Sequence, residues 1–351
     1  MTTIWIRAEE KPREARAPVA PKDAAKLLTA GFDVVVETSP ARAIPDAAYA
    51  EVGCRMVPFG SWRTAPSDAI ILGVKELPLD GPLSHRHIHF GHVFKDQTGW
   101  REDLARFRDG GGTLYDLEFL VDESGRRVAA FGYWAGYAGA ALGLLLWAGL
   151  ARGDTPPLAK IEPVSGQAEL LDRVRTALNG QTPTALVTGA LGRCGTGATD
   201  MLTAVGITPT RWDIAETAHG GPFPEIIAHD LFVNCVLAAP GIPVFVPQDA
   251  LPTLARRLTA VADVSCDPSS DYNPVPIYDR TTTFDDPAIV VATEGMPIAV
   301  TAIDHLPSLL PIESTEDYSA QLTPSLLTLN QLDQGVWARA KAEFDKHIAR
   351  L

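Results

Sequence analysis

The sequence predicts an α/β protein with two domains, each built around a mostly parallel β-sheet. Its 351 residues are more than one compact hydrophobic core usually organises. Short apolar runs alternate with helical segments along the chain, which is typical of strand–helix–strand units. A new series of this kind begins at Thr184, beyond a proline-rich connection at residues 154–163.

The first part of the chain is predicted to form a parallel sheet followed by a hairpin. Strands are expected at residues 3–7, 33–37, 69–74 and 87–91, with one helix at 21–30 and another that ends near Arg108, before the glycine run 110–112. Residues 69–74 are β-branched and aliphatic, as in strands that are buried on both faces. Residues 117–121 and 127–131 predict a β-hairpin, because turn-forming residues join them.

The second part begins with an apolar segment, residues 131–150, that is uncharged and long enough to span a bilayer. Its five glycines and its place between α/β patterns favour a helix buried between domains, with a membrane span as the alternative. Further strands are expected at 184–189, 208–213, 231–236, 261–265, 288–292 and 298–303, with a helix at about 194–206. The tail at 336–349 predicts an amphipathic helix that packs on the first domain.

The composition argues against several classes of protein. A formal charge of −13 argues against nucleic-acid binding, because phosphate contacts need a surplus of lysine and arginine. The four cysteines are widely separated without a CxxC spacing, so neither a structural zinc site nor a secreted disulfide framework is expected. The N-terminus has no basic start followed by an apolar run, so we expect no signal peptide and a cytoplasmic protein. The last three residues, Ala349-Arg350-Leu351, loosely resemble a peroxisomal address.

A glycine-rich turn predicts where a dinucleotide binds. Gly189, Gly192 and Gly195 follow the strand at 184–189 and open the next helix. Glycines allow the backbone to approach a pyrophosphate, whose charge a helix N-terminus stabilises. The GxxGxxG spacing is a variant of the consensus, but Asp213 ends the following strand, where an acid binds the adenosine ribose. A carboxylate there favours NAD over NADP; the alternative is that Asp213 only caps a helix.

Two of the cysteines are predicted to lie near this turn. Cys194 is within it, and Cys235 ends a strand expected in the same sheet. The pattern leaves open a reversible disulfide between them or two buried free thiols, and the thiols are the expected state.

Ionisable residues follow two predicted strands of the first domain, and ligands bind at such strand ends in open α/β sheets. Lys75 and Glu76 end the strand at 69–74, and His92 and Lys95 follow the next one. A lysine beside a carboxylate in a partly dry site can have a pKa low enough to accept a proton, and histidine titrates near neutrality. The alternative is an ordinary solvated strand end.

Other residues are candidates for binding carboxylates or lining the site. Arg7, Arg16 and Arg127 suit bidentate pairing with carboxylates, although Arg127 also fits an ordinary surface position. Glu118 is predicted to be buried on a strand face, either in the site or as a salt-bridge anchor. Asp304 ends a later strand at the edge of the second domain.

Motifs along most of the chain resemble one enzyme family. They are RAEEKPREARAPVAP, GSWRTAP, ILGVKELP, GHVFKDQTGW, GTLYDLEFL, GRRVAAFG, GALGRCGTGA, HGGPF, VNCVL and IDHLPSLLP. These resemble NAD-dependent, lysine-forming saccharopine dehydrogenases, whose wider relatives are alanine dehydrogenase and the nucleotide-binding parts of proton-pumping transhydrogenase. The resemblance implies two Rossmann-like domains with parallel sheets and a cleft between them. It places a substrate and catalytic domain at residues 1–130 plus 312–351, and an NAD-binding domain at 131–311.

The resemblance also implies a reaction and its residues. The family splits saccharopine with NAD and water into L-lysine, 2-oxoglutarate and NADH. Lys75 matches the base that acts on the secondary amine, and His92 matches the acid–base group for water attack. Substrate-site positions are matched by Arg16, Glu76, Lys95, Gln97, Glu118, Arg127 and Asp304. NAD-site positions are matched by Gly189, Leu191, Gly192, Arg193, Cys194, Gly195, Asp213, Cys235, His305 and Leu306.

This interpretation implies a set of partners and has three rivals. The ligands are NAD and small-molecule substrates (saccharopine, lysine and 2-oxoglutarate), with no metal, nucleic acid or membrane, in a monomer or small homo-oligomer. The rivals are a related opine-type or amino-acid dehydrogenase acting on another amine, a catalytically silent NAD-binding protein, and a membrane protein anchored by residues 131–150.

Overall fold

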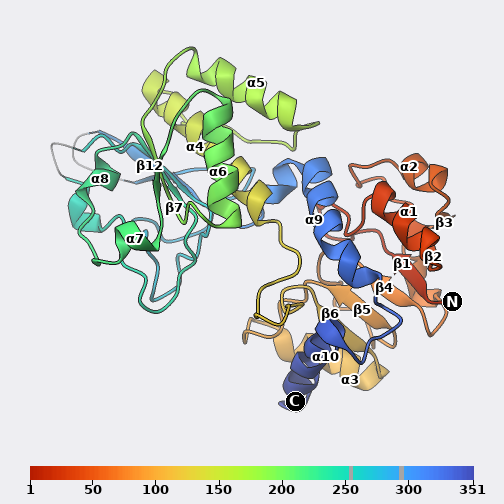
Figure 1. Ribbon diagram of the computed structural model, residues 1–351. Helices are drawn as coiled ribbons and strands as arrows, with labels where there is room; N and C mark the ends of the chain where they lie inside the picture. The colour runs from red at the N-terminus through yellow and green to blue at the C-terminus, as the bar shows by residue number, and fades with distance from the viewer. Residues whose placement is uncertain (253–255, 292–295) are drawn as a thin grey trace. The chain divides into compact units, whose positions relative to one another are not determined.

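The chain divides into two compact units in the computed structural model (Figure 1). The structure describes residues 1–252, 256–291 and 296–351. The first unit consists of Met1–Ala130 together with Pro311–Leu351, and the second is Phe131–Leu310. The chain therefore leaves the first unit once, builds the second from a continuous segment, and returns to complete the first.

The sheet of the first unit is parallel, in the strand order β3-β2-β1-β4-β5-β6. Its elements are β1 (Thr3–Ile6), α1 (Pro21–Thr29), β2 (Asp33–Glu37), α2 (Asp46–Glu51), β3 (Arg55–Val57), the 3₁₀ helix η1 (Ser61–Thr64), β4 (Ile70–Leu72), β5 (Arg86–His89), α3 (Trp100–Gly110), β6 (Thr113–Asp116), α9 (Pro311–Leu326) and α10 (Gly335–Ile348). The strand order reverses between β1 and β4, so the ligand crevice of this sheet is expected at the carboxyl ends of those two strands.

The C-terminal segment completes this unit. α10 packs along β6, where Trp337 meets Tyr115 edge to face at 5.8 Å between ring centroids. α9 lies beside α1 (Figure 1). The Thr315 hydroxyl of α9 accepts the buried N–H of Ala17 at 3.0 Å, which ties this helix to the loop after β1. The helix predicted at 336–349 is therefore present as α10, and it covers the sheet of the first unit.

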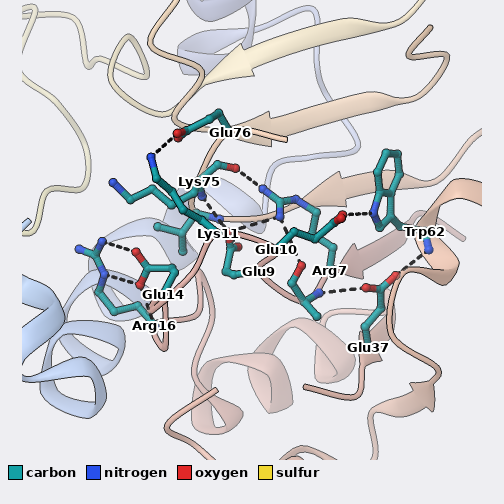
Figure 2. Close-up of polar contacts among 12 residues, drawn as sticks. Arg7, Glu9, Glu10, Lys11, Glu14, Arg16, Glu37, Trp62, Lys75 and Glu76 are labelled. Atoms are coloured by element: carbon teal, nitrogen blue, oxygen red, sulfur yellow. Dashed lines mark hydrogen bonds and ion pairs between the residues drawn. The ribbon is translucent and has the colours of Figure 1, made fainter. Parts of the chain in front are cut away.

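A buried carboxylate joins β1 and β2 to the loop that precedes β4. Glu37 accepts hydrogen bonds from the Trp5 indole and from the backbone N–H groups of Ala8, Gly60 and Trp62, at 2.6–3.1 Å. Both of its oxygens are thereby satisfied, which a buried carboxylate requires. Figure 2 shows Glu37 and Trp62 at this junction.

The predicted β-hairpin after β6 is present only around its turn, where the Asp122 N–H donates to the Arg126 carbonyl oxygen at 2.9 Å and the Val128 N–H to that of Leu120 at 3.0 Å. Within the described chain this region has a single antiparallel bridge, between Val121 and Arg127. The Asp116 carboxylate accepts the N–H of Glu118 at 2.8 Å and turns the backbone away before a strand can form. The Asp122 carboxylate then organises the next turn by accepting backbone N–H groups. Local side-chain hydrogen bonds therefore replace the rest of the strand pairing that the apolar pattern predicted.

Histidines of β5 face the core of the first unit. His87 is fully buried and makes edge-to-face contacts with Trp62 and Phe107, at 5.4 and 5.6 Å between ring centroids. Neither ring nitrogen of His87 has a hydrogen-bond partner among the described residues. Burial, reinforced by the charge of Arg7, lowers the pKa of His87 well below its ordinary value, and the same causes lower the pKa of His89.

We expect His87→Phe to make the first unit less sensitive to acid. The unfolded chain takes up a proton at His87 below about pH 6.5, whereas the folded protein does not, so stability is lost as the pH falls. One such histidine removes about 2 kcal/mol of unfolding free energy between pH 7 and pH 5. Urea unfolding at the two pH values measures this loss, with a variant of the exposed His219 (His219→Gln) as the control. An equal loss in wild type and His87→Phe would contradict the prediction.

The sheet of the second unit has the strand order β11-β12-β10-β9-β7-β8. Its elements are α4 (Gly132–Arg152), α5 (Gln167–Leu178), β7 (Ala185–Thr188), α6 (Arg193–Ala204), β8 (Thr210–Trp212), α7 (Ile214–Thr217), α8 (Pro224–Ile227), β9 (Leu231–Asn234), η2 (Gln248–Ala250), β10 (Ala260–Asp263), β11 (Ile289–Val291), β12 (Ile298–Thr301) and η3 (Leu306–Leu309). β11 runs antiparallel to β12, whereas the other strand pairs of this sheet are parallel, in agreement with the mostly parallel sheet that the sequence predicts. An antiparallel strand is readily added at an exposed edge, and β11 is that edge. The last residue of the strand predicted at 288–292 lies outside the described residues.

α4 is the core helix of the second unit. It packs against β9, β10, β12 and α6, and 72% of its most apolar stretch is buried. Its length and hydropathy would suit a membrane span, but its own sheet and α6 cover the apolar surface. A Cβ at Gly136 would lie 1.8 Å from the Cys194 carbonyl oxygen, and one at Gly197 would lie 1.9 Å from that of Tyr133. α4 and α6 therefore cross with their backbones in contact, which only glycine permits at these positions.

Candidate active site

The candidate active site lies where the strand order of the first unit reverses. β1 and β4 are neighbours, with Ile6 opposite Leu72, so the chain leaves both strands at the same edge of the sheet. The loop after β1 contains residues 7–16, and the loop after β4 begins with Gly73 and carries Lys75. Two charged loops therefore meet at the edge where open α/β sheets bind ligands.

Two ion pairs flank Lys75 (Figure 2). Glu76 pairs with Lys11. Arg16 donates two hydrogen bonds to Glu14, at 2.8 and 2.6 Å, and both of these side chains are buried. All four groups act electrostatically on the amine of Lys75, which is therefore surrounded by two cations and two carboxylates.

Lys75 is prepared to lose its proton. Partial burial lowers the pKa of Lys75 below its ordinary value, and the positive charges of Arg16 and Lys11 lower it further. The carboxylates of Glu14 and Glu76 oppose this shift. A lysine whose pKa is lowered can accept a proton near neutral pH, which a fully solvated lysine cannot do.

His92 follows β5, the strand beside β4. Its backbone is left-handed, with φ of 55°, and its ring stacks on Phe90 at 6.4 Å between centroids. Desolvation and the charge of Lys75 lower the pKa of His92, while Glu76 and Glu118 oppose the shift. A lowered pKa keeps the imidazole neutral, which is the form that takes a proton from water. Lys75 and His92 thus lie in one electrostatic neighbourhood.

The loop after β5 carries a further cation, Lys95. Lys95 pairs with Glu118 at 2.7 Å, and the backbone N–H of Lys95 donates to the Gln97 side chain at 2.8 Å. Asp116 anchors both neighbouring turns, because its carboxylate accepts the N–H groups of Gly91 and Glu118. Burial raises the pKa of Asp116 to about 7.

The C-terminal helix fixes this loop. His347 stacks on Phe94 with 4.5 Å between ring centroids. Arg350 pairs with Asp96 at 2.5 Å. The end of α10 therefore holds the segment that carries Lys95 in place.

The arginines predicted to bind carboxylates occupy different environments. Arg16 is buried and paired, and Arg127 is half-buried on the turn after β6. Burial and the charge of Asp116 raise the pKa of Tyr318 in α9, and the charges of Arg16 and Arg127 partly offset this. Both arginines therefore lie near the same tyrosine. Arg7 is buried, and its guanidinium donates to the carbonyl oxygens of Ala8 and Lys75 and to the Glu9 carboxylate, so these contacts occupy it.

The glycine turn of the second unit fits a dinucleotide. It joins β7 to α6, and Gly189 has φ of 68°, a conformation that favours glycine. A Cβ at Gly189 would lie 2.9 Å from the Cys235 carbonyl oxygen, and one at Gly195 would lie 2.2 Å from that of Gly189. Gly192 is the N-cap of α6 and provides no side chain to cover the helix N-terminus. The turn can therefore receive a pyrophosphate, whose charge the helix end would stabilise.

Asp213 follows β8, and its contacts fit both predicted roles, as the cap of a helix and as the acid beside the glycine turn. One carboxylate oxygen accepts the N–H of Ile214 at 2.9 Å, and Glu216 completes a capping box. The other oxygen accepts the N–H of Leu191 at 3.0 Å, which places the carboxylate against the glycine turn. The helix cap thus orients an acid at the position where ribose hydroxyls bind.

Cys194 and Cys235 are both free thiols in the structure, and their side chains are in hydrogen-bond contact. Burial raises the pKa of Cys235 well above its ordinary value, and Cys194 raises it further. Of the two predicted states, a disulfide or two free thiols, the structure therefore has the free thiols, and Cys235 is protonated.

Asp304 and His305 follow β12, in the same unit as the glycine turn. The Nδ1 atom of His305 donates to the Asp304 carboxylate at 2.5 Å, and the ring meets Phe284 edge to face at 4.9 Å between centroids. Leu306 is buried in the core of this unit. Asp304 therefore lies in the unit that carries the glycine turn, whereas the other candidate substrate-site residues lie in the first unit.

Comparisons with known proteins agree with this geometry. Residues 5–138 match the family model described as alanine dehydrogenase/PNT, N-terminal domain. Saccharopine dehydrogenase (NAD+, L-lysine-forming) of Yarrowia lipolytica is 48% identical over 99% of this chain and 98% of its own. The enzyme of the same name from Schizosaccharomyces pombe is 48% identical over 99% of both chains. The chain belongs to the saccharopine dehydrogenase family.

The fold of this saccharopine dehydrogenase family member is shared more widely. A solved structure of L-alanine dehydrogenase, 19% identical, has a TM-score of 0.66 and covers 99% of this chain and 94% of its own. The fold of two Rossmann-like units is therefore confirmed.

The residues that the saccharopine dehydrogenase resemblance implied fall into two groups. The first unit holds Arg16, Lys75, Glu76, His92, Lys95, Gln97, Glu118 and Arg127. The second unit holds Gly189, Leu191, Gly192, Arg193, Cys194, Gly195, Asp213, Cys235, Asp304, His305 and Leu306. In the described part of the chain no cluster of three or more His, Cys, Asp or Glu residues could hold a metal ion.

Three charged residues of the candidate site were not predicted from the sequence. Lys11 and Glu14 pair with Glu76 and Arg16, and Asp116 anchors the turns on either side of Lys95. A signal existed for the first two, because they lie in a dense charged run directly after a buried strand at the reversal of strand order. Asp116 carried no such signal, since its role depends on two backbone N–H groups.

Proposed function

We propose that this chain catalyses the NAD-dependent oxidative cleavage of saccharopine to L-lysine and 2-oxoglutarate, with Lys75 and His92 as the proton-transfer groups. The observation that carries the assignment of these two residues is their shared setting. Both follow adjacent strands, both have a lowered pKa, and the charge of Lys75 acts on His92. The relatives that match nearly the whole chain are saccharopine dehydrogenases, which supports the same reaction here.

We propose that arginines of the first unit bind the substrate carboxylates. Saccharopine carries three carboxylates, and a protein with a net charge of −13 must meet them with a local positive field. Arg16, Arg127, Lys11 and Lys95 supply this field in the first unit. Glu14 already holds the guanidinium of Arg16 in a fixed orientation, which lowers the entropy lost when a carboxylate binds.

We propose the following proton transfers. Lys75 removes the proton from the secondary amine of saccharopine as the adjacent carbon loses a hydride. The C–N single bond thereby becomes the C=N bond of an imine. His92 takes a proton from the water that attacks the imine carbon. The nitrogen takes up one proton as the carbinolamine forms and a second as the C–N bond breaks. The hydroxyl oxygen loses its proton to become the keto oxygen of 2-oxoglutarate, and lysine is released. Each of the two groups is expected to contribute roughly 10²–10⁴ in rate.

We propose that NAD binds at the glycine turn, with Gly189, Gly192 and Gly195 beside its pyrophosphate and Asp213 at its ribose. The bound nicotinamide supplies the hydride acceptor. Leu191, Arg193, Cys194 and Cys235 border this turn, and His305 with Leu306 follow β12 of the same sheet. A carboxylate at Asp213 disfavours a 2′-phosphate, which is why NAD is preferred to NADP.

NADH absorbance after mixing the purified protein with NAD and saccharopine tests this function. We expect absorbance to grow with saccharopine and NAD, and to remain low with NADP. Adducts of 2-oxoglutarate with ornithine or alanine serve as parallel substrates. Turnover of one of these adducts, with none of saccharopine, would retain the chemistry and overturn the substrate.

We further propose a role for each unit, a cellular compartment and an oligomeric state. Residues 1–130 with 312–351 form the substrate domain, and residues 131–311 form the NAD domain. The enzyme works as a cytoplasmic protein, as a monomer or a small homo-oligomer. Size-exclusion chromatography with light scattering measures the oligomeric state, and fluorescence microscopy of the tagged protein tests the compartment.

A further inference from the structure

The backbone of Lys75 is held by a buried carboxylate that the proposed chemistry does not use. Glu9 lies in the loop after β1 and accepts the N–H of Val74 at 2.6 Å and the N–H of Lys75 at 2.9 Å. Each carboxylate oxygen thus serves one of two consecutive peptide groups. Glu9 is 8% exposed, so few water molecules compete for these hydrogen bonds.

Arg7 completes the contact from the other side of the same peptide. Its guanidinium donates to the carbonyl oxygen of Lys75, to the carbonyl oxygen of Ala8 at 3.3 Å and to the Glu9 carboxylate at 3.3 Å. Figure 2 shows Arg7 and Glu9 beside the Lys75 backbone. A Cβ at Gly73 would lie 2.4–2.6 Å from the guanidinium, so the residue before Val74 must be glycine for Arg7 to occupy this place.

The pair has little freedom to move. Arg7, Glu9, Glu14 and Arg16 border a cavity of only about 10 Å³, enough for about one water molecule. β4 ends at Leu72, and beyond it the Val74 carbonyl oxygen still accepts the Phe90 N–H at 2.9 Å, so one backbone hydrogen bond also holds the peptide before Lys75. Glu9 and Arg7 therefore provide the side-chain hydrogen bonds that fix the peptide groups on both sides of the Lys75 α-carbon.

We propose that Arg7 and Glu9 are positioning residues for Lys75. They hold its backbone so that the amine stays in the partly dry space between the Lys11–Glu76 and Arg16–Glu14 pairs. This placement, in turn, keeps the lysine able to accept a proton. The inference rests on the proposed function only in assigning Lys75 as the base.

The test compares Glu9→Gln with wild type. A glutamine amide can accept one of the two N–H groups, but its own NH₂ then faces the other donor, so the Lys75 peptide must shift. We expect kcat for saccharopine oxidation to fall about 10- to 100-fold, because small displacements of a reacting group cost rates of this order. We expect the affinity for NAD to stay within about twofold, and the acidic limb of the kcat/KM profile to move to higher pH.

A matched control separates positioning from general stability. Asp23 is a buried carboxylate of the same unit that accepts hydrogen bonds from Lys26 and Ser319, neither of which belongs to the segments that carry Arg7, Glu9 or Lys75. Asp23→Asn is expected to lower the melting temperature while kcat and the pH profile below that temperature remain those of wild type. Equal losses of kcat in the two variants would overturn the proposal.

A second readout does not depend on turnover. Competitive acetylation with trace acetic anhydride across a pH series, quantified on the Lys75 peptide by mass spectrometry, reports the pKa of the Lys75 amine. Glu9→Gln should raise this pKa towards that of an ordinary lysine, and an unchanged titration would refute the positioning role. If wild type cleaves no saccharopine but the titration shifts, the proposed function fails and the positioning role stands.

Arg7→Lys is the second test variant, to be used if Glu9→Gln does not fold. The lysine keeps a cation beside Glu9, but a single ammonium lacks the planar fork that reaches three acceptors. The same increase in the pKa of Lys75, with a reduced kcat, is expected. A wild-type titration and kcat in this variant would contradict the proposal.

Discussion

Replacement of Lys75 by methionine is expected to lower kcat for saccharopine oxidation by roughly 10²–10⁴ and to leave NAD affinity unchanged. Methionine retains much of the length of the lysine in a half-buried position but cannot accept a proton. Loss of the ammonium should also raise the pKa of His92, because the charge of Lys75 lowers it. Steady-state kinetics, NAD titration by fluorescence and NMR titration of the His92 ring measure the three effects.

Lys26→Met is the control for this substitution. The Lys26 side chain is 61% exposed and pairs with Asp23 on α1, away from the proposed machinery. It should show wild-type kcat. A Lys75→Met enzyme with kcat within twofold of wild type would remove Lys75 from the mechanism.

Gly136→Ala is expected to destabilise the second unit by about 3 kcal/mol or more. The new methyl group would lie 1.8 Å from the Cys194 carbonyl oxygen and 3.0 Å from the Ala198 nitrogen, so the backbones of α4 and α6 must separate. Cys194 is in the first turn of α6, directly after the glycine turn. We therefore expect weaker NAD binding together with a lower melting temperature.

Gly132→Ala provides the comparison within the same helix. A Cβ at Gly132 would meet its nearest neighbour, Arg193, at 3.4 Å, which is an ordinary contact. This variant should differ from wild type by less than about 1 kcal/mol. Thermal unfolding with and without NAD measures both variants, and equal stabilities would contradict the close crossing of α4 and α6.

The sequence predicted most elements of the fold because their signals are local. Strands such as β2 and β9 each contain a run of three apolar residues, and α6 begins directly after a glycine turn. The hairpin after β6 is shorter than predicted because the Asp116 and Asp122 side chains bind nearby backbone N–H groups. The antiparallel direction of β11 had no local signal, since neighbouring strands decide direction at a sheet edge.

The candidate site was predicted only in part, for a related reason. Lys75 and His92 were recognisable because they follow buried strands. Glu9 and Lys11 act on residues about 65 positions further along the chain, so no spacing in the sequence connects them. Their partners become visible only when β1 and β4 are known to be adjacent.

The return of the chain to its first unit has a consequence for synthesis on the ribosome. The second unit is contiguous and can fold as soon as it has emerged, whereas β6 stays uncovered until α10 has been synthesised. Tyr115 and Trp337, which pack together, are roughly 220 residues apart in the sequence. At about 5–20 residues per second, the nascent chain leaves this face of the sheet uncovered for roughly 10–45 s. During that interval the incomplete N-terminal half is the part of the polypeptide most exposed to chaperones and to aggregation.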